Sequence, residues 1–321
     1  MTDVQTAIQI DSLNKIYRSG KDSTIHAVKD INLSLPAGII FGFLGPNGAG
    51  KTTTIKMICS LVRPTSGSIS VNGYDVGRQR SSAMRQIGAV LEGTRNIHWA
   101  LSAWDNLIYY GHLKGLWGKK LADRAEKLLR EMELWDRRGD LVRVFSRGMQ
   151  QKIAVACALI ADPPIILLDE PTLGLDVQAA RTVKSLVGRL SQEYGKTVVL
   201  TTHQLDMAQA LCDRIAIIRK GQVITDQPTE KLLGQFRDEY YQIKVEGRDH
   251  ALPIFERMTV EEKEDHTLLT GPIDNQASLY DLLDRLRAQN VTLLAVNQTE
   301  PNLEEVFVRL VETGPGQREG E

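Results

Sequence analysis

The stretch "GPNGAGKTT", Gly45–Thr53, decides the fold of this 321-residue chain. It follows the apolar run "IIFGFL" and leads into the helix-like "TIKMI". From Gly45 to Thr52 it fits the spacing G-x-x-x-x-G-K-[ST], which is typical of a loop that holds phosphate groups. Glycines let successive backbone N–H groups converge on phosphate oxygens, and the start of a helix adds partial positive charge. Because a strand precedes the loop and a helix follows it, this interpretation outweighs a glycine-rich turn with an incidental lysine.

The residue types in this loop predict its nucleotide contacts. Lys51 can reach the β- and γ-phosphates of a nucleoside triphosphate, and the Thr52 hydroxyl can ligate magnesium. Lys51 is also predicted to be catalytic, because its charge would stabilise the phosphoryl group during transfer. The loop residues predicted to bind ATP are Gly45, Pro46, Asn47, Gly48, Ala49, Gly50, Lys51, Thr52 and Thr53.

A second element with predicted chemistry is "IILLDE", residues 165–170. Its four apolar residues indicate a buried strand, and Asp169 and Glu170 follow at the end where open α/β sheets bind ligands. Asp169 suits magnesium, and Glu170 can polarise an attacking water. Alone, an Asp-Glu pair after a strand is more often a surface turn. Beside a phosphate loop, the catalytic interpretation is favoured.

The rest of the pattern predicts an α/β protein with a P-loop NTPase core and a parallel sheet. "IQIDSLNKIY" and "AVKDINLSL" alternate apolar and polar residues, which indicates an antiparallel β subdomain before it. We predict a nucleotide-binding domain over residues 1–234 with a helical insert at about 92–145. A small α+β appendage over residues 235–312 and a disordered polar tail over residues 313–321 follow.

Composition narrows the possible partners. A net charge of −1 gives no support to a protein held on nucleic acid by bulk positive charge, so we expect no nucleic acid partner. The three cysteines, Cys59, Cys157 and Cys212, lie far apart in apolar surroundings and are expected to be buried thiols. The chain starts without a signal-peptide pattern, and no window reaches the roughly 18 apolar residues that span a bilayer. Any role at a membrane is therefore expected to depend on a partner.

Three further motifs complete an ordered set: "FSRGMQQK" at residues 145–152, "GLD" at 174–176 and "TTH" ending in His203. With the phosphate loop and the Asp-Glu strand, they make the chain resemble the nucleotide-binding subunit of an ATP-binding cassette (ABC) transporter over about residues 8–225. The resemblance implies an ATPase that uses ATP and Mg²⁺. It also implies that Glu170, His203 and Lys51 are the catalytic residues.

The resemblance assigns roles to residues outside the phosphate loop. Ser146 and Gly148 would meet the γ-phosphate of ATP held by a second subunit, either another copy or a paralogue, in a head-to-tail dimer. Asp176 would lie at the dimer contact, Tyr17 would stack on adenine, and His203 would contact the γ-phosphate. Each has an ordinary alternative: a helix cap for Ser146, a core tyrosine for Tyr17, a structural histidine for His203.

Two positions depart from the family pattern. Glu92 stands where the family has a magnesium-contacting glutamine, and it is predicted to be a metal ligand. Its charge could instead weaken nucleotide binding, or the side chain could face solvent or a membrane partner. Arg147 stands in place of the usual glycine, which fits the export-type branch, and it could add positive charge where the two subunits meet.

The resemblance implies an export function. The chain would power export of an unidentified substrate through a separate membrane permease, at the cytoplasmic face of the cell membrane. The aromatic segment around Asn96–Trp117 is a candidate docking surface for the permease, or otherwise a tryptophan-rich core. One alternative is a soluble ABC-type ATPase associated with ribosomes or DNA, although a single phosphate loop and no coiled-coil insertion speak against it. Another is a nucleotide-gated scaffold without hydrolysis, against which Glu170 and His203 argue.

Overall fold

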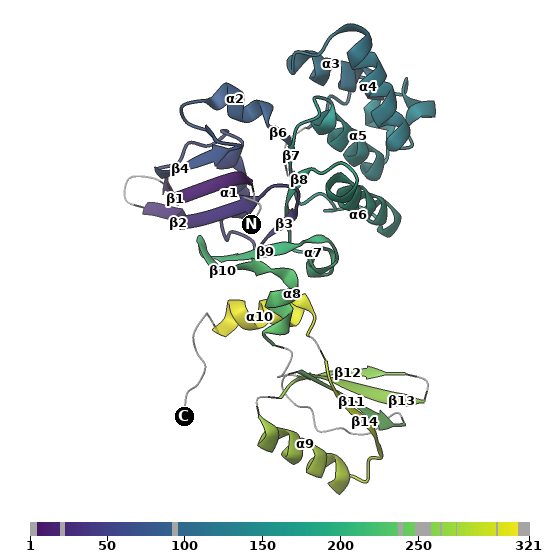
Figure 1. Cartoon of the computed structure of the whole chain (residues 1–321). Coiled ribbons are helices and arrows are strands. Elements are labelled where there is room, and N and C mark those ends of the chain that lie inside the picture. Colours follow the sequence, from purple (N-terminus) through teal and green to yellow (C-terminus); the bar gives the residue numbers. More distant parts are fainter. Residues whose placement is uncertain are drawn as a thin grey trace. The chain divides into compact units, whose positions relative to one another are not determined.

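The computed structural model describes residues 5–19, 23–91, 96–236, 240–247, 258–263, 265–273, 275–299 and 301–313. The chain divides into two compact units, Met1–Gln227 and Pro228–Glu321 (Figure 1). The domain boundary predicted after residue 234 stays a prediction, as does the disordered tail, of which residues 314–321 lie outside the described part.

The first unit begins with an antiparallel sheet of strand order β2-β1-β4-β5. Its strands are β1 (Thr6–Ser19), β2 (Ser23–Pro36), β4 (Ser66–Val71) and β5 (Tyr74–Asp75). Alternate residues of β1, such as Ile8 and Ile10, are buried, as the period of two requires. Asn72 and Gly73 both have positive φ and make the tight turn between β4 and β5. The predicted antiparallel subdomain is therefore confirmed.

The second sheet of this unit has the order β10-β9-β3-β8-β7-β6, and the strands from β9 to β6 are parallel. Its strands are β3 (Ile40–Leu44), β6 (Ile87–Val90), β7 (Ile165–Asp169), β8 (Thr197–Thr202), β9 (Arg214–Arg219) and β10 (Gln222–Pro228). Every residue of β3, β7 and β8 is buried. Strands covered on both faces are buried on both sides and rich in apolar residues, which explains why these segments do not alternate.

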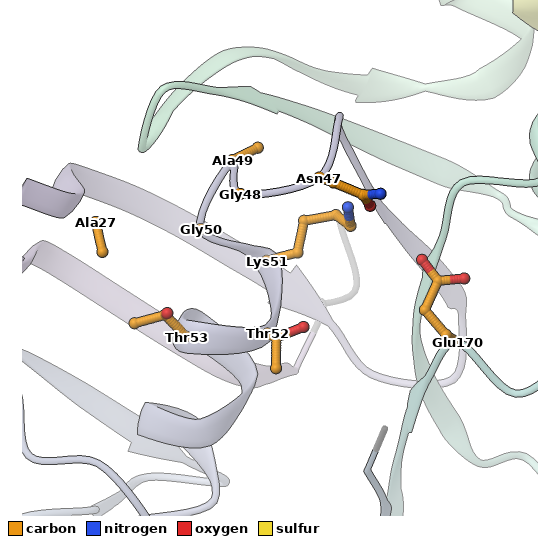
Figure 2. Close-up of a pocket in the computed structure, with 9 residues that line it drawn as sticks. All are labelled: Ala27, Asn47, Gly48, Ala49, Gly50, Lys51, Thr52, Thr53 and Glu170. Carbon is orange, nitrogen blue, oxygen red and sulfur yellow. The ribbon is translucent and has the colours of Figure 1, made fainter. Parts of the chain in front are cut away.

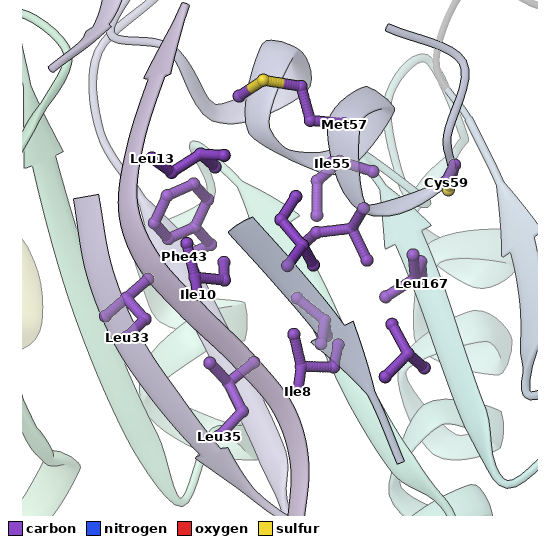
Figure 3. Packing of buried hydrophobic residues seen from close by; sticks show 14 of the residues in the cluster. Ile8, Ile10, Leu13, Leu33, Leu35, Phe43, Ile55, Met57, Cys59 and Leu167 are labelled. Atoms are coloured by element: carbon purple, nitrogen blue, oxygen red, sulfur yellow. The ribbon is translucent and has the colours of Figure 1, made fainter. Parts of the chain in front are cut away.

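One hydrophobic core joins the two sheets to the helix that follows the phosphate loop, α1 (Lys51–Ile58). Ile55 and Met57 of α1 pack in it with Ile10 of the antiparallel sheet and Phe43 and Leu167 of the parallel sheet (Figure 3). Burial of each such side chain stabilises the fold by about 1.5–3 kcal/mol. The other helices of the core unit are α2 (Arg80–Arg85), α5 (Arg147–Leu159), α6 (Val177–Gln192) and α7 (Leu205–Leu211).

A helical insert follows β6 in the chain, and its predicted bounds, about 92–145, stay a prediction. It contains α3 (Ala103–Leu113), α4 (Gly118–Glu131) and the 3-10 turns η1 (Trp135–Arg137) and η2 (Val142–Val144). Figure 1 shows α3, α4 and α5 gathered at one end of the unit, away from β1 and β2. On α4, Leu121, Ala125 and Leu128 are buried at spacings of three and four residues, so one helix face packs inward.

The described residues of the second unit form an antiparallel sheet of order β12-β13-β11-β14 and three helices. Its elements are α8 (Thr229–Gly234), β11 (Tyr240–Glu246), β12 (Thr259–Glu262), β13 (His266–Pro272), α9 (Gln276–Ala288), β14 (Leu293–Gln298) and α10 (Leu303–Thr313). Leu282 and Leu286 of α9 pack against Ile243 and Val245 of β11. The predicted α+β appendage is confirmed, although the sequence reading missed β12, whose residues are all exposed.

All three cysteines are buried and none forms a disulfide, as predicted. Burial raises the pKa of the Cys59 and Cys212 thiols to about 12 and raises that of Cys157 as well. Among the described residues, no helix is both long and apolar enough to cross a membrane.

Candidate functional site

The phosphate loop leaves a fully buried strand, β3, and enters α1 through two glycines in the left-handed region. Gly48 has φ +77° and Gly50 has φ +110°. A Cβ at Gly50 would lie 2.5 Å from the carbonyl oxygen of Ala27, so both the backbone angle and the space require glycine there. Gly50 caps α1 without any side-chain hydrogen bond. Glycine has no side chain that could cap the helix, which makes this helix start suited to an anion.

Lys51 is held over this loop rather than extended into solvent. Its side chain is only 6% exposed, and its Nζ donates to the carbonyl oxygens of Gly45 at 2.7 Å and Pro46 at 3.3 Å. Figure 2 shows it extending along the loop toward Asn47. Of the predicted loop residues, Gly45 and Pro46 thus contribute carbonyls that position the ammonium group.

A pocket of about 330 Å³ opens in front of the loop (Figure 2). Its lining consists of loop residues together with one residue of β2 and one that follows β7: Asn47, Gly48, Ala49, Gly50, Lys51, Thr52, Thr53, Ala27 and Glu170. The Glu170 carboxylate faces the loop from the opposite side (Figure 2). The pocket therefore brings a cation and backbone N–H groups opposite a carboxylate, an arrangement that can hold phosphates beside a water-polarising group.

Asp169 lies below this pocket at the end of β7 and is 2% exposed. Its Oδ1 accepts hydrogen bonds from the hydroxyls of Thr52 at 3.3 Å and Thr201 at 2.5 Å. Its Oδ2 is buried and has no hydrogen-bond partner within the described structure. A buried carboxylate oxygen is costly to leave unpaired. A cation bound by Asp169 and the Thr52 hydroxyl would satisfy it.

Glu170 follows directly and has a strained backbone with φ +51°. Its N–H donates to the carbonyl oxygen of Thr201 at 3.0 Å, which fixes the bend at the end of β7. Its Oε2 lies 2.9 Å from Nδ1 of His203, and the side chain of His203 is exposed while that of Glu170 is nearly buried. Two of the three predicted catalytic side chains, Glu170 and His203, are therefore in contact, with the imidazole on the solvent side.

The "FSRGMQQK" and "GLD" motifs form a second cluster, which we call the signature face: Ser146, Arg147, Gly148, Gly174 and Asp176. Ser146 caps α5 by accepting from the N–H of Met149 at 3.3 Å. Asp176 caps α6 by accepting from the N–H of Ala179 at 2.8 Å.

The two helix starts of the signature face are packed together. A Cβ on Gly148 would lie 2.5 Å from Cβ of Ala179, so only glycine permits this approach of α5 to α6. None of Ser146, Gly148 and Asp176 lines the phosphate pocket of the same chain. The predicted ATP-binding residues thus separate into two groups on one copy.

Two predicted residues remain, Tyr17 and Glu92. Tyr17 is exposed on β1 opposite Ile25 of β2, and the Lys15 ammonium lies 4.9 Å from its ring centroid. Tyr17 does not line the pocket, but Ile25 lies two residues from Ala27, which does. Glu92 falls on residues 92–95, which lie outside the described part of the chain. Its predicted contact with the metal stays a prediction.

The sequence reading missed one residue that lines the pocket, Ala27, and one that contacts Asp169 and Glu170, Thr201. Ala27 forms a wall through its backbone and a methyl group, and such a residue carries no chemical signal. Thr201 bonds both Asp169 and Glu170. Its position at the end of β8, next to β7 in the sheet, could have indicated it, since carboxyl ends of neighbouring parallel strands meet at one edge.

The tryptophans of the insert divide between surface and interior. Trp99 and Trp117 are 49% and 66% exposed, whereas Trp104 and Trp135 are half-buried and meet edge to face at 6.1 Å. His112 stacks on Trp117 with ring centroids 4.2 Å apart. Only part of the predicted aromatic set is therefore exposed.

Comparison with known proteins gives consistent results. Residues 28–173 match the family model described as "ABC transporter", and residues 240–297 match one described as "Domain of unknown function (DUF8691)". The linearmycin resistance ATP-binding protein LnrL of Bacillus subtilis is 35% identical over 94% of this chain and 97% of its own length. The daunorubicin/doxorubicin resistance ATP-binding protein DrrA of Streptomyces peucetius is 32% identical over 96% of this chain and 93% of its own.

Among solved structures, the ATP-binding cassette MJ0796, a dimer in a post-hydrolysis state with ADP and Pi, superimposes with a TM-score of 0.63. It is 29% identical and covers 69% of this chain and 98% of its own. The fold, the pocket and the relatives agree. This chain therefore belongs to the ABC transporter family: it is an ATP-binding subunit close to the resistance and export proteins, and it hydrolyses ATP to drive transport.

Proposed function

We propose that this chain works as one of two ATPase subunits on a separate membrane permease and powers export of a substrate not yet identified. The observation that carries the proposal is the separation, on one copy, of the phosphate pocket from the signature face. A second copy arranged head to tail would bring its signature face to the ATP in this pocket. The resistance functions named for LnrL and DrrA support export as the direction of transport.

The surroundings of the signature face support a second subunit there. Val144, Leu173 and Val177 flank it in the chain and are all exposed, Val177 by 73%. Single exposed apolar residues are common, but here they border two helix starts and a glycine that permits close approach. Covering them with a second copy would remove apolar area from water and supply the anion that both helix starts favour.

The residues of the pocket fit magnesium. Asp169 would bind it through the orphaned Oδ2, and Thr52 would bind it through a hydroxyl that now donates to Oδ1. Among the described residues, no three His, Cys, Asp or Glu side chains gather as a metal site. This accords with magnesium, which is usually held by one or two carboxylates together with substrate phosphates and water.

Hydrolysis would proceed with the chain's own groups in fixed places. Lys51 and the first N–H groups of α1 hold the β- and γ-phosphates and stabilise the charge that develops on them. The Glu170 carboxylate orients and polarises the attacking water, and His203 keeps that carboxylate in place while reaching toward the γ-phosphate. Bound magnesium would neutralise part of the triphosphate charge.

The permease would dock on the helical insert. Trp99, Tyr109, Leu113 and Trp117 are exposed there, and clustered exposed aromatic and aliphatic residues mark interaction surfaces. Docking on a membrane protein would hold the chain at the cytoplasmic face of the cell membrane, which is the location we propose.

The test is reconstitution with the membrane protein encoded beside this chain. The two proteins are co-expressed, purified in detergent and placed in vesicles, and ATP hydrolysis and export of relatives' antibiotics are followed. We expect the chain to co-purify with the membrane protein, with Trp117→Ser weakening the complex and Trp135→Ser serving as the control within the insert. A chain that associates with ribosomes and with no membrane protein would contradict the proposal.

A further inference from the structure

Arg147 occupies an unusual place in the signature face. It is the first residue of α5, it is exposed, and no acidic residue lies in the first turn of α5 or of α6. A cation at a helix start opposes the partial positive charge of that start, and here a second helix start lies beside it. Within the described residues, no ion pair joins Arg147 to a carboxylate, and the acidic residue of the signature face, Asp176, caps α6 instead.

The guanidinium is nevertheless held at a definite point. A Cβ built on Gly174 would lie 2.9 Å from Nη1 of Arg147, so the arginine passes directly over the loop that precedes α6. Gly174 has φ +72° and no side chain, which leaves room for the guanidinium. The "GLD" loop therefore leaves space for the guanidinium and keeps Arg147 within the signature face.

We propose that Arg147 of one copy donates its guanidinium N–H groups to the terminal phosphate of the ATP held by the other copy. This role rests on the head-to-tail dimer of the proposed function. A guanidinium matches phosphate oxygens with two parallel hydrogen bonds, which a glycine at this position cannot supply. The terminal phosphate is the anion that dimer closure brings to this face. Arg147 thereby makes closure depend on ATP rather than ADP.

The first test measures ATP-dependent dimerisation of the full chain in a Glu170→Gln background, which slows hydrolysis and removes the carboxylate nearest the phosphate. Analytical ultracentrifugation gives the ATP concentration for half-maximal dimer. Arg147→Gln should raise this concentration about tenfold or more, because a hydrogen bond to a charged group is lost at each site. Arg147→Lys should raise it less, since the charge remains and only the paired geometry is lost.

The matched control is Arg143→Gln, which removes an exposed arginine four residues upstream. It should change the half-maximal ATP concentration by no more than about twofold, as surface substitutions usually do. Binding of a fluorescent ATP analogue to the monomer should be equal in all variants, which shows that each is folded with an intact phosphate pocket.

A double-mutant cycle tests whether Gly174 leaves the space that the guanidinium of Arg147 occupies. Gly174→Ala should weaken dimerisation strongly when Arg147 is present and less when it is already glutamine, because the methyl group displaces the guanidinium. Dimerisation of Arg147→Gln at the same ATP concentration as the parent would overturn the inference and leave the dimer intact. An equal loss in Arg143→Gln would overturn it as well, in favour of general surface charge. If the Glu170→Gln parent itself stays monomeric with ATP, the proposed head-to-tail dimer is wrong, and this role of Arg147 with it.

Discussion

The starts of α1 and α5 use the same property of a helix in opposite ways. At α1, Gly50 provides no side-chain cap, and Lys51 is buried in a pocket of about 330 Å³. At α5, Ser146 caps the helix, and Arg147 is exposed and does not line the phosphate pocket of its own copy. A helix start becomes a complete anion site when the surrounding chain encloses it. When it stays on the surface, it can act only as half of a site.

The comparison separates binding from turnover. One copy alone has what it needs to hold phosphates, since the loop, Lys51, Thr52 and Asp169 come together within it. Hydrolysis in the proposed dimer also needs the signature face of the other copy. Substitutions at α1 should therefore change ATP binding by a single copy, whereas substitutions at the starts of α5 and α6 should change ATP hydrolysis only in the assembled pair.

The largest effect is expected at Lys51. Lys51→Ala removes a buried cation from the pocket, so ATP affinity of the monomer should fall about 100-fold or more. Isothermal titration calorimetry measures this directly. Lys56→Ala, the same change further along α1, is the control and should bind ATP like the unchanged chain. Retention of ATP by Lys51→Ala would break the comparison, because α1 would then not be a self-sufficient site.

Glu170→Gln should follow in size. The amide keeps the shape of the side chain but loses its charge and basicity, so turnover should fall by roughly 10²-fold or more while ATP still binds. Phosphate release measures turnover, and Asp206→Asn on α7 is a control with the same acid-to-amide change. Turnover close to that of the unchanged chain would remove Glu170 from the reaction.

A smaller effect is expected at the cap of α6. Asp176→Ala removes the acceptor for the N–H of Ala179 and should destabilise the unit by about 1 kcal/mol. Thermal unfolding should show a melting temperature lower by about 2–4 °C. ATP affinity of the monomer should not change. A weaker ATP affinity of the monomer would show that the start of α6 is coupled to the phosphate pocket within one copy. The phosphate pocket and the signature face would then not be independent within that copy.

The smallest effect concerns Asp162, remote from both helix starts. The hydrogen bond from Lys196 and the charge of Arg124 lower the pKa of this carboxyl. Because the folded pKa lies below the unfolded one, the stabilisation is complete above about pH 4 and is lost as pH falls further. Asp162→Asn should destabilise the protein at pH 7 by at most about 1 kcal/mol, since the Asp162 side chain is largely exposed. Urea unfolding at pH 7 and pH 3 should show this difference shrinking, with ATP hydrolysis at pH 7 unaffected.

Much of the fold was accessible from sequence because its signals are local. The motif from Gly45 to Thr52 is one short continuous segment. The apolar run before Asp169 identifies a strand and its end. The strand β12 was not predicted from the sequence. All its residues are exposed, so it lacks the alternation of buried and exposed residues that indicates a strand. An edge strand of that kind owes its conformation to pairing with β13 rather than to its own pattern.

The site was less accessible wherever a residue acts through its neighbours. The positive φ of Glu170 and the hydrogen bond that Thr201 donates to Asp169 depend on β7 and β8 lying side by side. The need for glycine at 148 arises from Ala179, more than thirty residues away along the chain. Only the assembled sheet and helices place these groups together.

The buried thiols can serve as probes of how often the core of this protein opens. All three cysteines lie in the first unit, none in Pro228–Glu321, and each thiol is inaccessible and holds its proton firmly at neutral pH. An alkylating reagent should therefore react only during moments when the surrounding core opens. The rate of labelling would report how often the core of the first unit opens. The second unit contains no cysteine, so this rate would not measure opening of the second unit. Cys59 directly follows α1 and Cys157 lies in α5. Mass spectrometry of each cysteine peptide would therefore give a separate opening rate for the surroundings of each helix.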